Sequence, residues 1–278
     1  ATEAGDLSAE IIGLATGWPE RLHAALLDAY PAEQAEQLSI RYAEAFNEMY
    51  MQMTPPSQSA RDIQLLEAIN ENNQVLADIF QDDRGRLNLR LYQFHNILLS
   101  EILPILDNFG LVILDQFSDP VGAADGDSCT IDTFRLQGVR TGDDDCIIDC
   151  SNELIDALEA VFTQKVTDDG LNQLILAARI PWAAVDMIRG YLGYAMQLNL
   201  RYSTVRIEEI LLAQPELVQG LWRLFHTRFD PTLQGDRNKA TNKIREAIEA
   251  QLRDLRAQDQ EITFRTIFNL IDSTLRTN

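Results

Sequence analysis

The sequence has little of what marks secreted, membrane or nucleic-acid-binding proteins. Three cysteines in 278 residues are too few, and odd in number, for a disulfide framework, which favours a reducing cytoplasm. The longest apolar run, Ile97 to Leu106, is interrupted by polar residues and proline, and it falls short of the roughly 20 residues that cross a bilayer. Only 23 basic residues stand against 43 acidic ones, giving a net charge of -20. We therefore predict a cytoplasmic protein with no membrane and no nucleic-acid partner.

The composition is that of an ordinary globular protein, with 46% hydrophobic and 24% charged residues. The length of 278 residues exceeds that of a typical domain with a single hydrophobic core. Apolar residues recur at helical spacing from Ser8 to Ile69, which predicts helices broken at Thr54-Pro55-Pro56-Ser57. The chain starts at Ala1 without a methionine and stops at Asn278 directly after a helical pattern. We expect a piece of a longer protein.

The period then changes to two. Val75 to Phe80 and Leu87 to Tyr92 flank Asp82-Asp83-Arg84-Gly85, which predicts a hairpin of antiparallel strands. A helical stripe from Ile97 to Phe109 ends at Gly110, where a left-handed cap is favoured. The pattern then predicts, in order, a strand, a polar loop and a second strand, over Leu111 to Phe117, Asp119 to Asp127 and Cys129 to Leu136.

From Asn152 to the end the apolar spacing is helical. Four segments carry the clearest stripes, with Pro181 and Pro215 where helices start. They are Val185 to Leu198, Ile207 to Phe225 and a terminal pair over Ile244 to Leu255 and Ile262 to Leu275. The fold class is therefore α+β and predominantly helical, with a small antiparallel sheet that has helices on one face, followed by a helical bundle. We predict three domains, over residues 1–70, 71–165 and 166–278.

Catalytic chemistry is hard to find in this sequence. Cys146 and Cys150 stand four apart beside an acidic run, but the three histidines are distant, so a four-ligand zinc site is disfavoured. Asp125-Gly126-Asp127 departs from the order of a calcium loop. The glycines do not follow a strand and open a helix, as a nucleotide loop requires. His95 near Ser100 has no orienting carboxylate and no exposing turn, so a hydrolase is disfavoured. We predict no catalytic, cofactor-binding or metal-binding residues.

Two further patterns favour structural explanations. Between Asp119 and Asp169 there are thirteen acidic residues against three basic ones, which is typical of a solvated face, or of a surface that docks a basic partner. Aromatic residues recur at helical spacing in the second half, which favours a place in the core over the lining of a cavity; they are Trp182, Tyr191, Tyr194, Trp222 and Phe225.

Several motifs resemble one known family. They include Asp169-Gly170-Leu171-Asn172-Gln173-Leu174-Ile175-Leu176-Ala177-Ala178, Leu224-Phe225-His226-Thr227-Arg228-Phe229-Asp230-Pro231 and Asn269-Leu270-Ile271-Asp272-Ser273-Thr274-Leu275-Arg276-Thr277-Asn278. Upstream, Leu103-Pro104-Ile105-Leu106-Asp107-Asn108-Phe109-Gly110-Leu111 is similar to an ACT-like regulatory segment of the same family. These motifs resemble the region upstream of the catalytic domain in large bacterial NAD-specific glutamate dehydrogenases. The likeness is weak over residues 1–70 and strong from 160 onward.

The resemblance implies a non-catalytic regulatory and assembly region of an enzyme that oxidatively deaminates L-glutamate to 2-oxoglutarate with NAD. The fragment alone is then inactive and binds no cofactor, while NAD serves the parent enzyme. Its partners are its own catalytic domain and the other subunits of a homo-oligomer. The role is a scaffold that positions the catalytic domain.

An amino-acid effector is the alternative partner that the resemblance implies. ACT relatives often bind one at a glycine-bearing turn between strand and helix, and the corresponding turn here has no glycine; it consists of Gln93, Phe94, His95, Asn96 and Ile97. Two alternatives to the scaffold role therefore stay open: an effector-sensing ACT-like module, and an acidic protein-interaction module.

Overall fold

A computed structural model describes residues 17–70, 74–122, 128–140, 146–198 and 200–275. The chain forms two compact units. Unit 1 consists of Ala1–Leu98 and Leu114–Arg135, and unit 2 of Leu99–Ile113 and Leu136–Asn278. Several predicted features lie outside the described residues: the segment before residue 17, the Asp125-Gly126-Asp127 sequence, the acidic run at 143–145 and the last three residues of the terminal motif.

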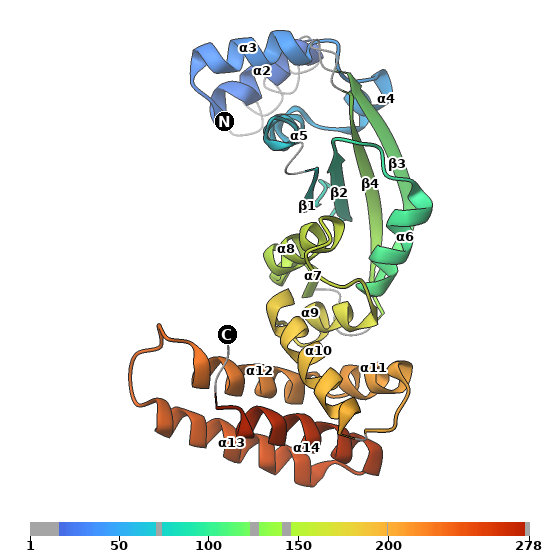
Figure 1. Cartoon of the computed structure of the whole chain (residues 1–278). Coiled ribbons are helices and arrows are strands. Elements are labelled where there is room, and N and C mark those ends of the chain that lie inside the picture. The colour runs from blue at the N-terminus through green and yellow to red at the C-terminus, as the bar shows by residue number, and fades with distance from the viewer. Residues whose placement is uncertain (1–16, 71–73, 123–127, 141–145, 199, 276–278) are drawn as a thin grey trace, which may run out of the picture. The chain divides into compact units, whose positions relative to one another are not determined.

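Unit 1 begins with four helices, α2 (Trp18–Ala29), α3 (Ala32–Tyr42), α4 (Glu48–Met53) and α5 (Pro56–Ala68). Helix α2 packs on α3 and on α5 (Figure 1). Their apolar stripes form one core, in which the rings of Phe46 and Tyr50 stack at 4.2 Å. The predicted break lies between α4 and α5, where Pro56 occupies the first turn of α5, a position that needs no backbone donor.

The sheet has four strands, β1 (Val75–Gln81), β2 (Leu87–Gln93), β3 (Leu111–Gly122) and β4 (Ser128–Val139), in the order β1-β2-β4-β3 (Figure 1). The predicted hairpin is confirmed, since β1 pairs antiparallel with β2 and Gly85 takes φ +73° in the turn, a conformation that favours glycine. The predicted loop from Asp119 is wrong at its start, because β3 continues to Gly122. A hydrogen bond from the Gly122 N–H to the Ala45 carbonyl, 3.2 Å, holds that extension.

One face of this sheet is polar. The register places Asp78 opposite Arg90, Arg90 opposite Thr133 and Asn88 opposite Arg135. Because side chains alternate along a strand, these residues share a face. The opposite face carries Ile79, Leu89, Leu91 and Phe134 instead. We call the first set the polar face, defined by Asp78, Phe80, Asn88, Arg90, Thr133 and Arg135.

Unit 2 is helical apart from the strand ends that it contains. Helix α6 (Leu99–Asn108) ends before Gly110, whose φ of +74° confirms the predicted cap. The next elements are α7 (Cys146–Asp149), α8 (Ser151–Phe162), the 3-10 turn η1 (Gly170–Gln173), α9 (Leu174–Ala177) and α10 (Trp182–Gln197). They are followed by α11 (Thr204–Leu212), α12 (Pro215–Phe229), α13 (Arg237–Asp254) and α14 (Gln258–Ser273).

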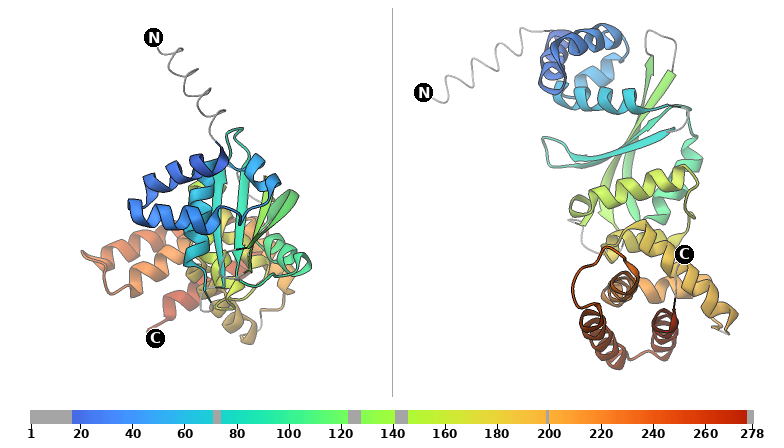
Figure 2. Two further views of the ribbon diagram at one scale, coloured as in Figure 1. Left: turned by 90° about the horizontal axis from the view of Figure 1, so that it is seen from above. Right: turned by 60° about the vertical axis from the view of Figure 1, so that its left-hand side comes forward.

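The predicted segment from Ile207 to Phe225 is two helices, α11 and α12, because the helix ends before Pro215 and a new one starts there. Helices α12, α13 and α14 pack on one another, and the right-hand view of Figure 2 looks nearly along their axes. The α+β class with a four-stranded antiparallel sheet and mostly helical remainder is confirmed. Among the described residues, no helix combines the length and the apolar character that a membrane crossing requires.

Candidate functional site

The predicted effector turn follows β2. The Gln93 side chain is buried and both of its polar ends are used by the chain itself: Nε2 donates to Asp132 Oδ2 at 2.5 Å, and Oε1 accepts from the Ile97 N–H at 2.7 Å. The rings of Phe94 and His95 meet edge to face at 4.7 Å. His95 and Asn96 are exposed. The Gln93 side chain therefore bridges Asp132 and the Ile97 backbone within the turn. Effector binding at this turn stays a prediction.

Asp132 is the buried centre of this region. Its carboxylate is 4% exposed and also accepts from Gln116 Nε2 at 2.7 Å. Burial raises the pKa of Asp132, while hydrogen bonds from Ser118, Gln116 and Gln93 oppose that rise. Neutral donors thus hold a carboxylate that most proteins would pair with a cation.

A second buried carboxylate ties α5 to the polar face. Asp62 is fully buried and accepts from Tyr92 Oη at 2.7 Å and Gln58 Nε2 at 3.0 Å, as well as from Tyr50 Oη and Arg90 Nη1. The Arg90 side chain is only 8% exposed. Its guanidinium also donates to two threonine hydroxyls, at Thr54 and Thr133, 3.1 Å each. All the strong acceptor positions of Asp62 are occupied, so this network is an internal fastening of unit 1.

Beside that network the polar face opens into a pocket of about 880 Å³. We call it the sheet pocket. The segment from Asn47 to Gln58 and the β1–β2 turn form its walls, and β2, β3 and β4 contribute to its lining. Four arginines line it, together with the rings of Phe80 and Phe117; they are Arg84, Arg86, Arg90 and Arg135.

In unit 2, the first family-like motif forms a network of hydrogen bonds around the Asp169 carboxylate, which we call the Asp169 lock. Asp169 caps η1 by accepting from the Leu171 N–H at 3.0 Å. Arg189 of α10 donates to both oxygens of the same carboxylate, from Nε to Oδ2 at 3.0 Å and from Nη2 to Oδ1 at 2.8 Å. It also donates to Asn172 Oδ1 at 2.7 Å. Bidentate pairing of this kind fixes geometry as well as charge. The charged residues of this motif hold helices together.

The other two motifs contact each other. Arg228 of α12 donates through Nη2 to the Thr274 carbonyl at 3.0 Å, and through Nη1 to the Ile271 carbonyl. These are carbonyls at the end of α14, which a cation stabilises. Arg245 of α13 pairs with Asp272 at 2.5 Å. Three helices therefore meet through residues of the motifs that carry the resemblance.

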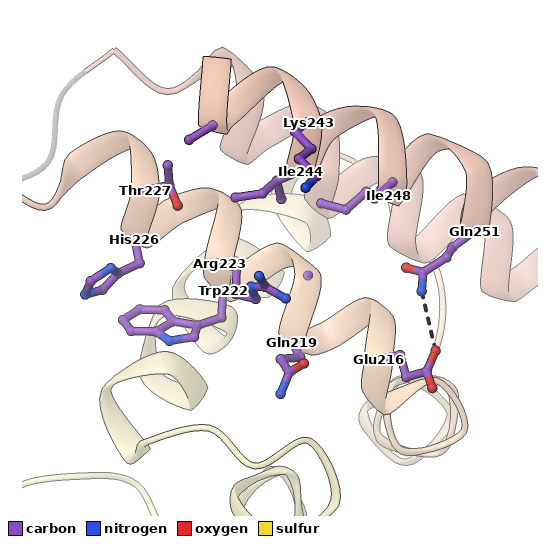
Figure 3. Close-up of a pocket in the computed structure, with 13 residues that line it drawn as sticks. Glu216, Gln219, Trp222, Arg223, His226, Thr227, Lys243, Ile244, Ile248 and Gln251 are labelled. Atoms are coloured by element: carbon purple, nitrogen blue, oxygen red, sulfur yellow. Dashed lines mark hydrogen bonds between the residues drawn. The ribbon is translucent and has the colours of Figure 1, made fainter. Parts of the chain in front are cut away.

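A groove of about 810 Å³ lies between α12 and α13 (Figure 3). Ile244 and Ile248 of α13 face α12, where Gly220 leaves room; a Cβ there would come within 3.2 Å of Ile248. Gln251 Nε2 donates to Glu216 Oε2 at 3.5 Å across the groove. The lining mixes apolar and charged side chains of both signs, which suits helix packing.

The aromatic residues predicted for the core are not fully buried. Trp222 and Phe225 stack at 6.1 Å, and Tyr191 meets Phe225 edge to face at 6.1 Å, but all three are only partly buried and Tyr194 is 64% exposed. The helical spacing correctly indicated that these aromatic rings lie together, but the prediction that they are buried in the core was wrong. Cys146 and Cys150 are buried. Within the described residues, no group of three or more metal-ligating side chains comes together.

Comparison with known proteins finds similarity to one family. Three family models match successive segments: glutamate dehydrogenase helical motif 2 over residues 25–69, its ACT3 domain over 75–146, and its helical motif 3 over 166–231. Three NAD-specific glutamate dehydrogenases are similar over most of the chain. That of Halomonas elongata is 26% identical over 98% of this chain, that of Mycobacterium tuberculosis 27% over 94%, and that of Pseudomonas aeruginosa 26% over 98%.

The match covers 17%, 16% and 17% of those three relatives, so the chain spans about a sixth of their length. The ACT3 match contains all four strands, and the helical-motif matches contain the Asp169 lock and Arg228. In this order of helical motif 2, ACT3 domain and helical motif 3, the chain is similar to one region of the NAD-specific glutamate dehydrogenases.

Proposed function

We propose that this chain is the non-catalytic regulatory and assembly region of a cytoplasmic NAD-dependent glutamate dehydrogenase. The parent enzyme converts L-glutamate to 2-oxoglutarate with NAD, and this region serves as a scaffold that positions the catalytic domain and joins subunits. In this proposal NAD belongs to the parent enzyme, and the chain itself binds no cofactor.

The observation that carries the proposal is the set of contacts made by charged residues within the match to helical motif 3. Arg189 donates hydrogen bonds to Asp169, and Arg228 donates to a carbonyl at the end of α14. Residues engaged in this way orient helices, whereas catalytic groups need free atoms directed at a substrate. The motifs shared with the family thus support a role in holding structure.

Exposed apolar side chains support assembly. At the end of α10, Tyr194, Met196 and Leu198 are 64%, 50% and 64% exposed. Tyr194 and Leu198 are four residues apart, so they lie on the same side of the helix end. Contiguous exposed apolar surface is typical of interaction sites. A second copy of the chain is the partner that we assign to this face.

The experiment is the particle mass in solution, measured by light scattering after gel filtration. We expect a dimer or larger for the wild type and a smaller particle for the double variant Tyr194→Glu/Leu198→Glu. The double variant Ile40→Glu/Leu114→Glu is the matched control, because Ile40 and Leu114 are 72% and 58% exposed in unit 1 and their replacement adds the same two charges. A wild type that is monomeric at all accessible concentrations would contradict the assembly role.

The same measurement at rising salt separates the scaffold from an acidic docking module. Exposed charges are screened beyond about 10 Å at 0.1 M salt. Assembly through apolar contacts should therefore persist or strengthen with salt. Assembly that weakens sharply would favour the acidic module instead.

A further inference from the structure

The floor of the sheet pocket is polar and deeply set. Asn88 and Arg90 line it and are 7% and 6% exposed. Asn88 Nδ2 donates to the Arg86 carbonyl at 2.8 Å. Asn88 Oδ1 accepts no hydrogen bond from the described residues and is not fully buried. A few polar groups that converge in a concave pocket are a common feature of ligand sites.

Guanidinium groups surround this floor. Arg86 is paired with Asp82 at 2.6 Å, and Arg90 is paired with Asp62. Arg135 is paired with Asp115 through Nη1, at 2.9 Å. A chain with net charge -20 therefore places four of its 23 basic residues around one pocket.

Two arginines retain donors for a ligand. The Arg84 guanidinium has no ion-pair partner in the part of the chain that the structure describes, and Arg135 is paired through one of its nitrogens. Of the carboxylates in the lining, Asp82 is held by Arg86 and Asp119 by Asn47 Nδ2 at 2.9 Å. Asp83, at the rim, and Asp119 are the lining carboxylates that no described cation neutralises.

Aromatic rings set the orientation of the deeper guanidiniums. The Arg90 guanidinium lies over the Phe80 ring at 5.1 Å, and that of Arg135 over the Phe117 ring at 5.4 Å. Cation–π contacts of this kind hold a planar guanidinium flat. The nitrogens of Arg90 are engaged by Asp62, Thr54 and Thr133, whereas Arg135 is paired through Nη1 alone. An edge with two parallel N–H groups matches a carboxylate or a phosphate.

We propose that the sheet pocket is a binding site for a small anion that carries a carboxylate or phosphate group. The oxyanion lies between Arg84 and Arg135, and Asn88 contacts the rest of the ligand at the floor. This site is separate from the Gln93 turn. It does not depend on the proposed scaffold role, because it follows from the lining of unit 1 alone.

The test is isothermal titration calorimetry of the whole chain with succinate and with inorganic phosphate as separate probes. We expect saturable binding of at least one of them, and the arm that responds identifies the source of the oxyanion. Charge-assisted hydrogen bonds contribute enough that Arg84→Gln and Arg135→Gln should each weaken binding by about tenfold or more. Arg253→Gln is the matched control, since this exposed arginine of α13 lies outside the pocket and loses the same charge.

Asp83→Asn provides an independent arm. Removing the unneutralised rim carboxylate should tighten the binding of an anion. Thermal melting of each variant checks the fold, and Arg84→Gln keeps the test sound if Arg135→Gln melts early, because Arg84 is exposed in a turn. No binding of either probe at millimolar concentration would overturn the proposal. So would equal weakening by Arg253→Gln, or weaker binding in Asp83→Asn.

Discussion

Loss of the Asp62 charge should destabilise unit 1 far more than loss of an equivalent surface charge. The variant Asp62→Asn keeps the shape of the side chain and leaves the Arg90 guanidinium, which is 8% exposed, without its counter-ion. Breaking a buried ion pair by removing one partner costs about 3 to 5 kcal/mol. For a protein of this size that corresponds to a fall in Tm of roughly 10 °C.

The matched control is Asp107→Asn. Asp107 pairs with Arg140, but both side chains are about half exposed, 54% and 49%. An exposed pair contributes about 1 kcal/mol or less. Hydrogen exchange followed by mass spectrometry reports where stability is lost. Asp62→Asn should speed exchange in α5 and β2 and leave α12 to α14 unchanged.

Two outcomes would refute this reasoning. The first is an Asp62→Asn variant that melts within a degree or two of Asp107→Asn. The second is a double variant Asp62→Asn/Arg90→Gln that is as unstable as the sum of its single variants, because residues in one network should not act additively.

Three further predictions follow from individual contacts. Arg228→Gln should remove a cation from the end of α14 and cost about 1 to 2 kcal/mol, seen as faster hydrogen exchange in α14; unchanged exchange would contradict it. Gly110→Ala should cost about 1 to 2 kcal/mol in chemical denaturation, because φ is +74° and the new Cβ would lie 3.0 Å from Gln173. Burial raises the pKa of Asp132, so its contribution to stability is present at low pH and is lost as pH rises through the folded-state pKa. Gln93→Leu removes a donor to the ionised form and should raise that pKa further in a carbon-13 NMR titration; an unchanged or lower pKa would count against the hydrogen bond.

Local patterns predicted most of the fold, because their causes are local. Alternation and a Gly85 turn placed the β1–β2 hairpin, and proline and glycine placed the start of α12 and the end of α6. The strand β3 was predicted too short because its extension depends on contacts with Ala45 and Asn47. Those partners are about seventy residues away in the sequence, beyond any periodicity signal.

The candidate sites were harder to predict from the sequence. Polar side chains alternate along one strand, at Asn88, Arg90 and Tyr92, and this pattern predicts a strand with one polar face. Polar residues at period two usually face water. Here that face is covered by α5, and only the position of Asp62 on α5 shows why arginine and tyrosine are tolerated in the interior. The closing role of Gln93 was equally invisible, because its partner Asp132 lies on another strand.

The resemblance of the motifs to a glutamate dehydrogenase added what periodicity lacked, and the family models match three of the four motifs, all but the terminal one. The geometry then gave those motifs a physical meaning. Arg189 and Arg228 both lie within the match to helical motif 3, and both hold helices in place. A charged residue in a family motif is therefore compatible with a purely structural role.

The most direct test of the central claim is the formation of NADH by the purified chain supplied with L-glutamate and NAD. The proposed role as a non-catalytic region predicts no NADH above the rate of a sample without protein, at any concentration of the chain. Formation of NADH in proportion to the amount of chain, retained through purification to a single species, would contradict it.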